Sequence, residues 1–184
     1  MNSELITAMK YLDLERRAAH EVEVRAELEQ LQSDLARMPR LREKLVFELL
    51  AIAERAFEGG GSLENPALLA MRMSSSVRPE NLPSYLASIE KIALQCFDLI
   101  GKSRESRFAL TLVGALASLH RTESRRFRIV LRELKRLCGT SKTDPRRKLL
   151  AIAKFSGPQR RQAMRHLMWR AESRNIELIR SAKN

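Results

Sequence analysis

The sequence is poor in the residues that build disulfide frameworks, sheets and flexible linkers. Among 184 residues there are 2 Cys, 7 Gly and 6 Pro, and aromatic residues make up 5%. Cys96 and Cys138 fall on apolar faces of predicted helices, a pattern typical of buried thiols in a reducing compartment. Leu, Ala, Arg and Glu are abundant and favour helix, so we expect an all-α helical bundle with an N-terminal long helix or helical hairpin.

Long apolar runs are also missing. No segment approaches the roughly 18 uncharged apolar residues of a membrane-spanning helix. The first residues have neither the basic start nor the apolar core of a secretory signal. We therefore expect a cytoplasmic protein with no membrane partner.

Patterns that carry chemistry are absent too. His20, His120 and His166 stand far apart, and none has a Cys, His or carboxylate at a metal-ligand spacing that recurs elsewhere. His20 with Glu23 or Glu27 forms only a weak helical pair, which is more typical of an exposed histidine. There is no nucleophile elbow, no Cys-x-x-Cys and no dinucleotide fingerprint, and the glycines at 59–61 lack the Lys and Ser/Thr of a P-loop. We expect no catalytic residue, no metal and no cofactor, and so a protein that is not an enzyme.

Charge is distributed unevenly along the chain. Residues 1–60 hold 9 Lys and Arg against 12 Asp and Glu, whereas residues 101–184 hold 22 against 6. The net charge of +12 therefore comes from the C-terminal half. So basic a region attracts phosphate polyanions, and this composition favours nucleic acid as a partner.

The N-terminal region predicts helices with a narrow apolar stripe. Ser3 to about Met38 is expected to form one long helix that Pro39 ends, and Leu41 to Phe57 a second helix that folds back as its antiparallel partner. Gly59, Gly60 and Gly61 then favour a mobile link. We predict an acidic helical hairpin or coiled-coil-like region over 1–58 and a basic helical bundle over 62–184.

The middle of the chain predicts a short helix and two longer ones. The short helix follows Asn65 and Pro66 and reaches about Met73. Ser84–Ile100 is amphipathic and is expected to stop at Gly101. Phe108–Leu119 contains no charged residue and should lie at the centre of the bundle.

Residues 121–138 separate apolar and basic side chains at helical spacing. Thr122 is a plausible N-cap, and Gly139 suits the end of the helix. The face expected to be buried comprises Phe127, Val130, Leu131, Leu134, Leu137 and Cys138. The arc roughly opposite comprises Arg125, Arg128, Arg132, Lys135 and Arg136, counting about 100° per residue.

Two further helix starts follow. Thr143 or Asp144 is expected to cap a helix with Pro145 in its first turn. Ser156 and Gln159 match a capping box that opens the last helix, whose core face includes Met164. Trp169 falls off that face, and we interpret it as an edge-of-core or contact residue.

A basic helical bundle with few aromatic residues suits contacts to sugar-phosphate backbone without reading of sequence. The connection from 139 to 145 is long for a helix-turn-helix, so reading of base sequence is not favoured. We predict that the protein binds DNA or RNA through a set of basic residues: Arg121, Arg125, Arg126, Arg128, Arg132, Lys135, Arg136, Arg146, Arg147, Lys148 and Arg165.

A resemblance agrees with this reading. The segment Leu116-Ala-Ser-Leu-His-Arg-Thr-Glu-Ser-Arg-Arg-Phe-Arg-Ile-Val-Leu, followed by Leu134-Lys-Arg-Leu and then Asp144 with Leu149-Leu150, resembles the small subunit of bacterial CRISPR Cascade-type surveillance complexes. The resemblance implies a basic all-helical subunit of a larger ribonucleoprotein in antiviral defence. Its strand contacts would be Arg125, Arg126, Arg128, Arg132 and Arg136.

A second function class stays open. The narrow Leu stripe of residues 28–38 also fits a protein–protein adaptor or chaperone that uses its N-terminal helices, with the basic face on an acidic partner. The same helices could mediate self-association or contact other protein subunits of a larger complex.

Overall fold

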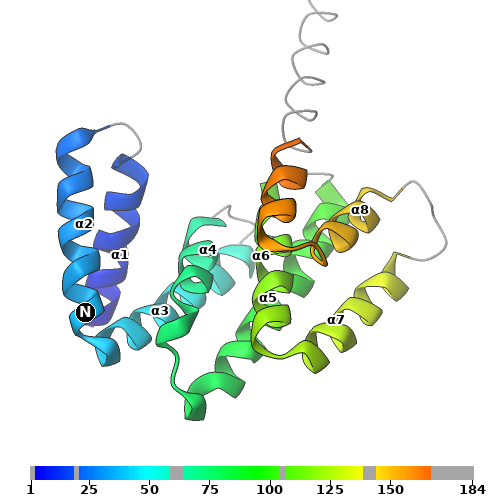
Figure 1. The fold of residues 1–184 in the computed structure, drawn as a ribbon, viewed down its shortest axis with the longest axis horizontal. Helices are drawn as coiled ribbons and strands as arrows, with labels where there is room; N and C mark the ends of the chain where they lie inside the picture. Colours follow the sequence, from blue (N-terminus) through cyan, green and yellow to red (C-terminus); the bar gives the residue numbers. More distant parts are fainter. Residues whose placement is uncertain (1–2, 19–20, 59–63, 104–106, 139–143, 167–184) are drawn as a thin grey trace, which may run out of the picture. The chain divides into compact units, whose positions relative to one another are not determined.

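The computed structural model describes residues 3–18, 21–58, 64–103, 107–138 and 144–166, and these residues form helices joined by short turns, with no strand among them (Figure 1). The all-α prediction is therefore confirmed. Two compact units are distinguished, Met1–Ile92 (unit 1) and Ala93–Asn184 (unit 2). Each unit is described by itself.

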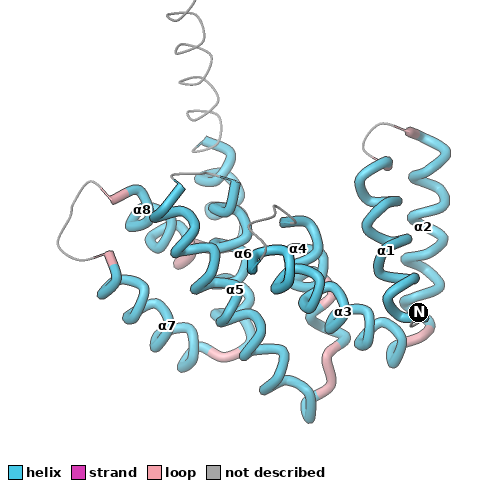
Figure 2. Tube along the Cα trace, turned by 180° about the vertical axis from the view of Figure 1, so that it is seen from behind, coloured by secondary structure: helices cyan, strands magenta, loops and turns pink. Residues whose placement is uncertain are grey.

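Unit 1 begins with a helical hairpin. Helices α1 (Ser3–Arg17) and α2 (Val22–Arg37) lie side by side in both views (Figures 1 and 2). Gln32 donates to the Tyr11 hydroxyl at 3.1 Å, and the Lys10 ammonium lies 3.0 Å from Glu27. The single helix predicted from Ser3 to Met38 is therefore wrong.

The chain reverses where the apolar pattern changes phase. Val22 is 77% exposed, whereas Val24 and Leu28 are buried. Two shorter helices bury more apolar area by packing on each other than one continuous narrow stripe could bury alone. Pro39 then begins α3 (Pro39–Glu58), because a proline is tolerated in the first turn of a helix.

Helix α3 confirms the second helix predicted from Leu41 to Phe57, and it packs against α1, α2 and α4 (Glu64–Arg72). The predicted boundary at 59–61 falls outside the described residues, and α4, which follows it, belongs to unit 1 together with α3. The division between the two compact units lies within α5 (Leu82–Ser103).

Glu43 is a buried carboxylate that ties α3 to the loop before α5. Its side chain is 3% exposed and accepts hydrogen bonds from the Arg78 amide at 2.9 Å, the Arg78 Nε at 2.6 Å and the Asn81 Nδ2 at 3.0 Å. The loop contains the short 3₁₀ turns η1 (Ser74–Ser76) and η2 (Pro79–Asn81). Burial raises the pKa of Glu43, but the bonds from Asn81 and Arg78 outweigh it and hold the pKa below its ordinary value.

Replacing this carboxylate should destabilise unit 1. Glu43→Gln places an amide N–H against donors, so we expect the free energy of unfolding to fall by about 1–3 kcal/mol at neutral pH. Because the folded pKa is lowered, the contribution of the carboxylate is present above the unfolded pKa and is lost as pH falls through the folded value. Urea unfolding at neutral and acid pH checks this, and a deficit in the variant that persisted unchanged at acid pH would contradict it.

Helix α5 runs past the predicted stop. Tyr85, Ile89 and Phe97 are buried on its apolar face as predicted, but Gly101 is followed by further helix to Ser103. Gly101 serves close packing instead of helix termination, because a Cβ there would collide with the Arg146 guanidinium.

Unit 2 is organised around α6 (Arg107–Thr122). Its uncharged stretch is buried on most sides as predicted, Leu112, Leu116 and Leu119 completely so. Helices α7 (Ser124–Leu137) and α8 (Pro145–Ile152) pack on α6 and on each other. Residues 157–166 form a further helix. The Gln159 Oε1 accepts from the Ser156 amide at 3.4 Å, so the glutamine half of the predicted capping box is present.

Candidate nucleic-acid interface

A one-residue turn sets the direction of α7. Glu123 has extended backbone between α6 and α7, its amide donates to Leu119 O at 2.8 Å, and its carbonyl accepts from Phe127 N at 3.0 Å. The rings of His120 and Phe127 lie 4.6 Å apart across the turn. The predicted N-cap Thr122 is wrong, because this residue belongs to α6 and its hydroxyl donates to Ser118 O.

The apolar face of α7 is buried almost as predicted. Phe127, Val130, Leu131, Leu134 and Cys138 are each at most 6% exposed. Leu137 departs from the prediction at 49% exposed, because it lies at the edge of the apolar arc in the last turn. Burial raises the pKa of the Cys138 thiol, with a smaller rise from Asp144, so this cysteine stays a neutral core residue.

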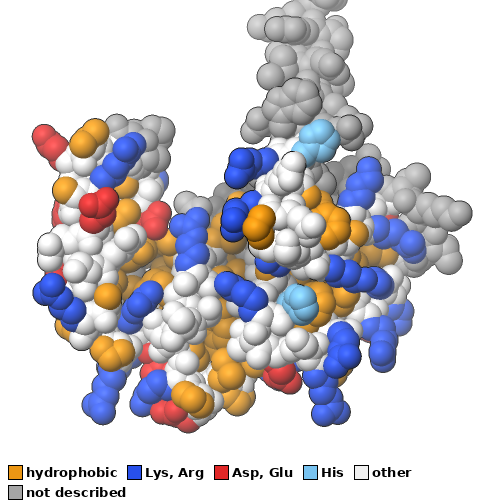
Figure 3. Space-filling model, in the orientation of Figure 1, with side chains coloured by type: hydrophobic (Ala, Val, Ile, Leu, Met, Phe, Trp, Pro, Cys, Tyr) orange, Lys and Arg blue, Asp and Glu red, His pale blue; other side chains and the backbone are white. Residues whose placement is uncertain are grey.

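The opposite side of α7 carries a row of cations. We call it the α7 stripe, and its members, all exposed, are Arg125, Arg128, Arg132 and Lys135. Within the described residues the three arginines make no ion pair or side-chain hydrogen bond. In Figure 3 the Lys and Arg side chains (blue) are frequent over α7 and α8, and Asp and Glu (red) are sparse there.

Two other basic residues of α7 already interact with neighbouring residues. The Arg136 guanidinium lies 2.7 Å from Glu133 Oε1 and 3.0 Å from Oε2, so its charge is partly neutralised. Arg126 is half-buried and already engaged by a neighbour. Both were predicted as strand contacts, and the geometry makes them weaker candidates than the α7 stripe.

Lys135 extends the stripe to the next segment of the chain. Its ammonium is so close to that of Lys154 that the contact lowers the pKa of Lys135, with a further contribution from burial. Two ammonium groups without an intervening carboxylate repel each other, and a bound anion between them would relieve that repulsion. Lys154 follows α8 and was not among the predicted site residues.

A second group of cations gathers at the end of α6. Burial, and then the charges of Arg121 and Arg161, lower the pKa of Arg160. The Arg160 Nη1 also donates to Ala153 O at 3.4 Å, so the backbone after α8 positions this guanidinium. Arg121 was predicted as a site residue. Arg160 and Arg161 were missed, although the basic pair directly behind the capping box was a usable signal.

Arg146 is placed inside unit 2 and not on its surface. It is anchored on Asp144, which caps α8 as predicted: the Asp144 carboxylate accepts from the Arg146 amide at 2.9 Å and from the guanidinium Nη2 at 2.7 Å. The guanidinium carbon lies 4.5 Å from the centre of the Phe97 ring, and the side chain is 20% exposed. The bonds from Arg146 lower the pKa of Asp144 against the opposing effect of burial.

The remaining predicted residues are spread over two elements. Arg147 and Lys148 are exposed in the first turns of α8, and Arg147 is engaged by a neighbour. Arg165 is exposed on the helix of residues 157–166. Trp169 and most of the predicted core face of the last helix lie outside the described residues. Met164, which is described, is buried as predicted.

The two compact units differ in net charge. Unit 1 holds 12 Lys and Arg against 15 Asp and Glu, and unit 2 holds 22 against 7. In the described part of unit 2, Glu133 and Asp144 are each already paired with an arginine. Unit 2 therefore presents a strongly positive surface.

No cluster of metal-ligating side chains occurs among the described residues. In the same part of the chain, no helix is both long and apolar enough to cross a membrane. Comparison with protein-family models, with curated proteins and with solved structures gives no match to this chain.

The packing of Arg146 predicts a stability role. Arg146→Met should lower the free energy of unfolding by about 2 kcal/mol, because it removes a charged hydrogen-bond network and a cation–π contact. Lys148→Met, an exposed cation of the same helix, is the matched control and should change stability little. Thermal and urea unfolding measure both.

The pH dependence of the stability lost in Arg146→Met tests whether the Asp144–Arg146 bonds cause that loss. Asp144 has a lowered pKa, so the contribution of the pair is complete above the unfolded pKa of Asp and vanishes as pH falls through the folded value. The difference in stability between the two proteins should shrink at acid pH to the part contributed by the Phe97 contact. Equal stability of wild type and Arg146→Met at neutral pH would contradict the structural role of Arg146 and leave it a candidate for nucleic-acid binding.

Proposed function

We propose that the protein is a non-catalytic nucleic-acid-binding protein that holds the sugar-phosphate backbone of DNA or RNA with the α7 stripe and the cations beside it. The observation that carries the proposal is the α7 stripe itself. Its arginines project from a helix whose other face is locked in the core, and they lack a carboxylate partner among the described residues.

The spacing of the stripe suits a regular polyanion. Arg125, Arg128 and Arg132 recur every three or four residues, so their side chains are separated by about one helical turn of 5.4 Å each. Arginine donates several N–H groups in a planar fork and binds phosphate well. Contacts of this type position a nucleic acid without identifying its sequence.

The resemblance of residues 116–150 to the small subunit of Cascade-type complexes supports a more specific proposal. The protein would act in the cytoplasm as one small subunit of a larger ribonucleoprotein of antiviral defence, and its basic unit would hold a nucleic-acid strand. Other subunits, or further copies of the chain, would contact the N-terminal helices.

The α7 stripe can be tested by charge removal. Replacing Arg125, Arg128 and Arg132 together with Gln should weaken binding of a mixed-sequence oligonucleotide by roughly 10-fold to 100-fold at 0.1 M salt, because three phosphate contacts are lost. A plot of log affinity against log salt should also flatten by about 2 to 3 units. Fluorescence anisotropy over a salt series gives both quantities, and circular dichroism checks the helices.

A control variant with the same change in net charge distinguishes the loss of a local binding site from a general loss of positive charge. Arg37, Arg40 and Arg55 are exposed on α2 and α3 of unit 1, and their replacement with Gln removes the same three charges. This control should keep most of the affinity and the slope. The proposal fails if both triple variants lose affinity equally, or if the α7 variant binds as the wild type does.

A protein–protein adaptor is the second candidate, and the α1–α2 hairpin favours it. Ile6 and Met9 lie one helical turn apart on α1 and are 48% and 56% exposed. An exposed apolar pair of this kind can bind a partner helix. Such a complex would change little with salt, whereas binding through phosphates weakens steeply.

A further inference from the structure

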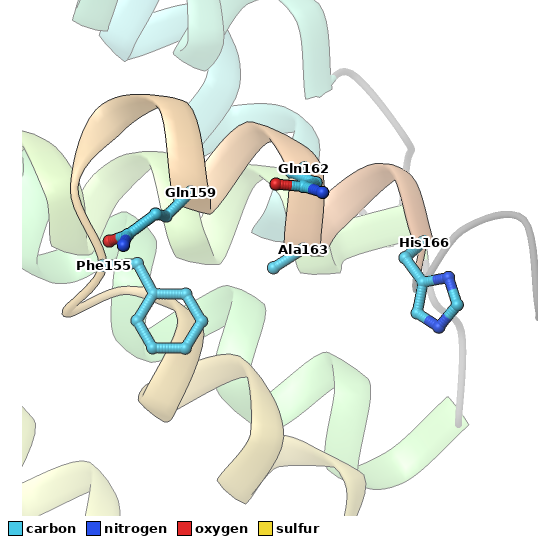
Figure 4. Close-up of a pocket in the computed structure, with 5 residues that line it drawn as sticks. All are labelled: Phe155, Gln159, Gln162, Ala163 and His166. Atoms are coloured by element: carbon cyan, nitrogen blue, oxygen red, sulfur yellow. The ribbon is translucent and has the colours of Figure 1, made fainter.

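A hollow of about 570 Å³ opens beside the cationic surface of unit 2, where α8 gives way to the last described helix. Its described lining is formed by Phe155, Gln159, Gln162, Ala163 and His166. Figure 4 shows the Phe155 ring below Ala163 and Gln159, with His166 at the far end of the same helix. None of these residues was among the predicted site residues.

The lining combines a flat apolar surface with amide groups. Phe155 is 43% exposed although it is aromatic, and Ala163 opposite it has a side chain too small to cover the ring. The Gln159 Oε1 accepts from the Ser156 hydroxyl at 2.9 Å, which fixes this side chain at the rim of the hollow. An aromatic face with nearby amides and an imidazole is the chemistry that binds an unstacked nucleobase.

One cation beside the α7 stripe is adjacent in the chain to the hollow. Lys154, the partner of Lys135 on the α7 stripe, is the residue directly before Phe155. Arg161 and Arg165 are exposed on the helix that carries Gln159 and Ala163, but their helical positions place them off the face that lines the hollow. A strand that follows the α7 stripe to Lys154 would bring its next base to the Phe155 ring.

We propose that this hollow binds one unpaired nucleobase by stacking on Phe155, so that the preferred ligand of the protein is single-stranded nucleic acid. The inference rests on the proposed function, since the α7 stripe and Lys154 would hold the phosphates that precede the stacked base. In a continuous duplex the base stays paired and stacked, and it cannot enter the hollow without disruption of the helix.

The test compares a single-stranded oligonucleotide with an abasic oligonucleotide of the same length and charge. Phe155→Leu keeps apolar bulk but removes the aromatic face. It should weaken binding of the normal strand by roughly 5-fold to 100-fold and leave binding of the abasic strand unchanged. The salt slope should stay at the wild-type value, because stacking releases no counterions.

Two controls make the result specific. Phe155→Tyr keeps the ring and should restore wild-type affinity, whereas Ile129→Ala removes an exposed apolar side chain of α7 and should change nothing. The α7 triple variant should weaken both oligonucleotides, so failure of the phosphate site can be told from failure of the base site.

Two results would overturn the base site. One is equal binding of the normal and abasic strands by the wild type. The other is unchanged affinity of Phe155→Leu for the normal strand. A fluorescent adenine analogue in the strand offers an independent signal, because stacking on Phe155 should quench it in the wild type and not in Phe155→Leu.

Discussion

Burial of the apolar face of α7 against α6 and α8 is the constraint from which the rest of unit 2 follows. Phe127, Val130, Leu131 and Leu134 fix the rotation of the helix about its axis, because turning any of them outward would expose apolar surface at a cost of about 1.5–3 kcal/mol each. Once the rotation is fixed, the arginines at intermediate positions must face solvent. The same packing that stabilises the fold therefore aligns the charges that we propose bind phosphate.

Basic residues in unit 2 serve two different purposes, and their surroundings tell them apart. Arg146 has a carboxylate and an aromatic ring within contact distance, so its charge is neutralised by contacts within unit 2. Arg132 has neither among the described residues, so its charge acts on solvent and on any ligand. A count of basic residues in the sequence treats these two arginines alike, whereas coordinates separate a structural cation from a binding one.

The sequence predicts helices well where apolar periodicity is strong, and less well where packing between segments decides. The bounds of α3, the burial of α6 and the apolar face of α7 follow from local pattern, since each helix buries what its own spacing brings to one side. The turn between α1 and α2 could not be predicted, because reversal depends on the energy of packing two helices together. The hollow at Phe155 was missed although its described lining comes from the single stretch 155–166, because packing and not local pattern decides whether an apolar side chain there is covered. The predicted partners and function remain predictions.

The most direct test is to locate the residues that a nucleic acid contacts. Backbone amide chemical shifts of the isotope-labelled full-length chain, recorded during titration with a single-stranded oligonucleotide, locate that contact directly. The account predicts that the perturbed amides map to α7 and to residues 154–165 of unit 2, and that those of α1 and α2 do not move. Perturbation centred on the α1–α2 hairpin, or spread evenly over both units, would contradict it.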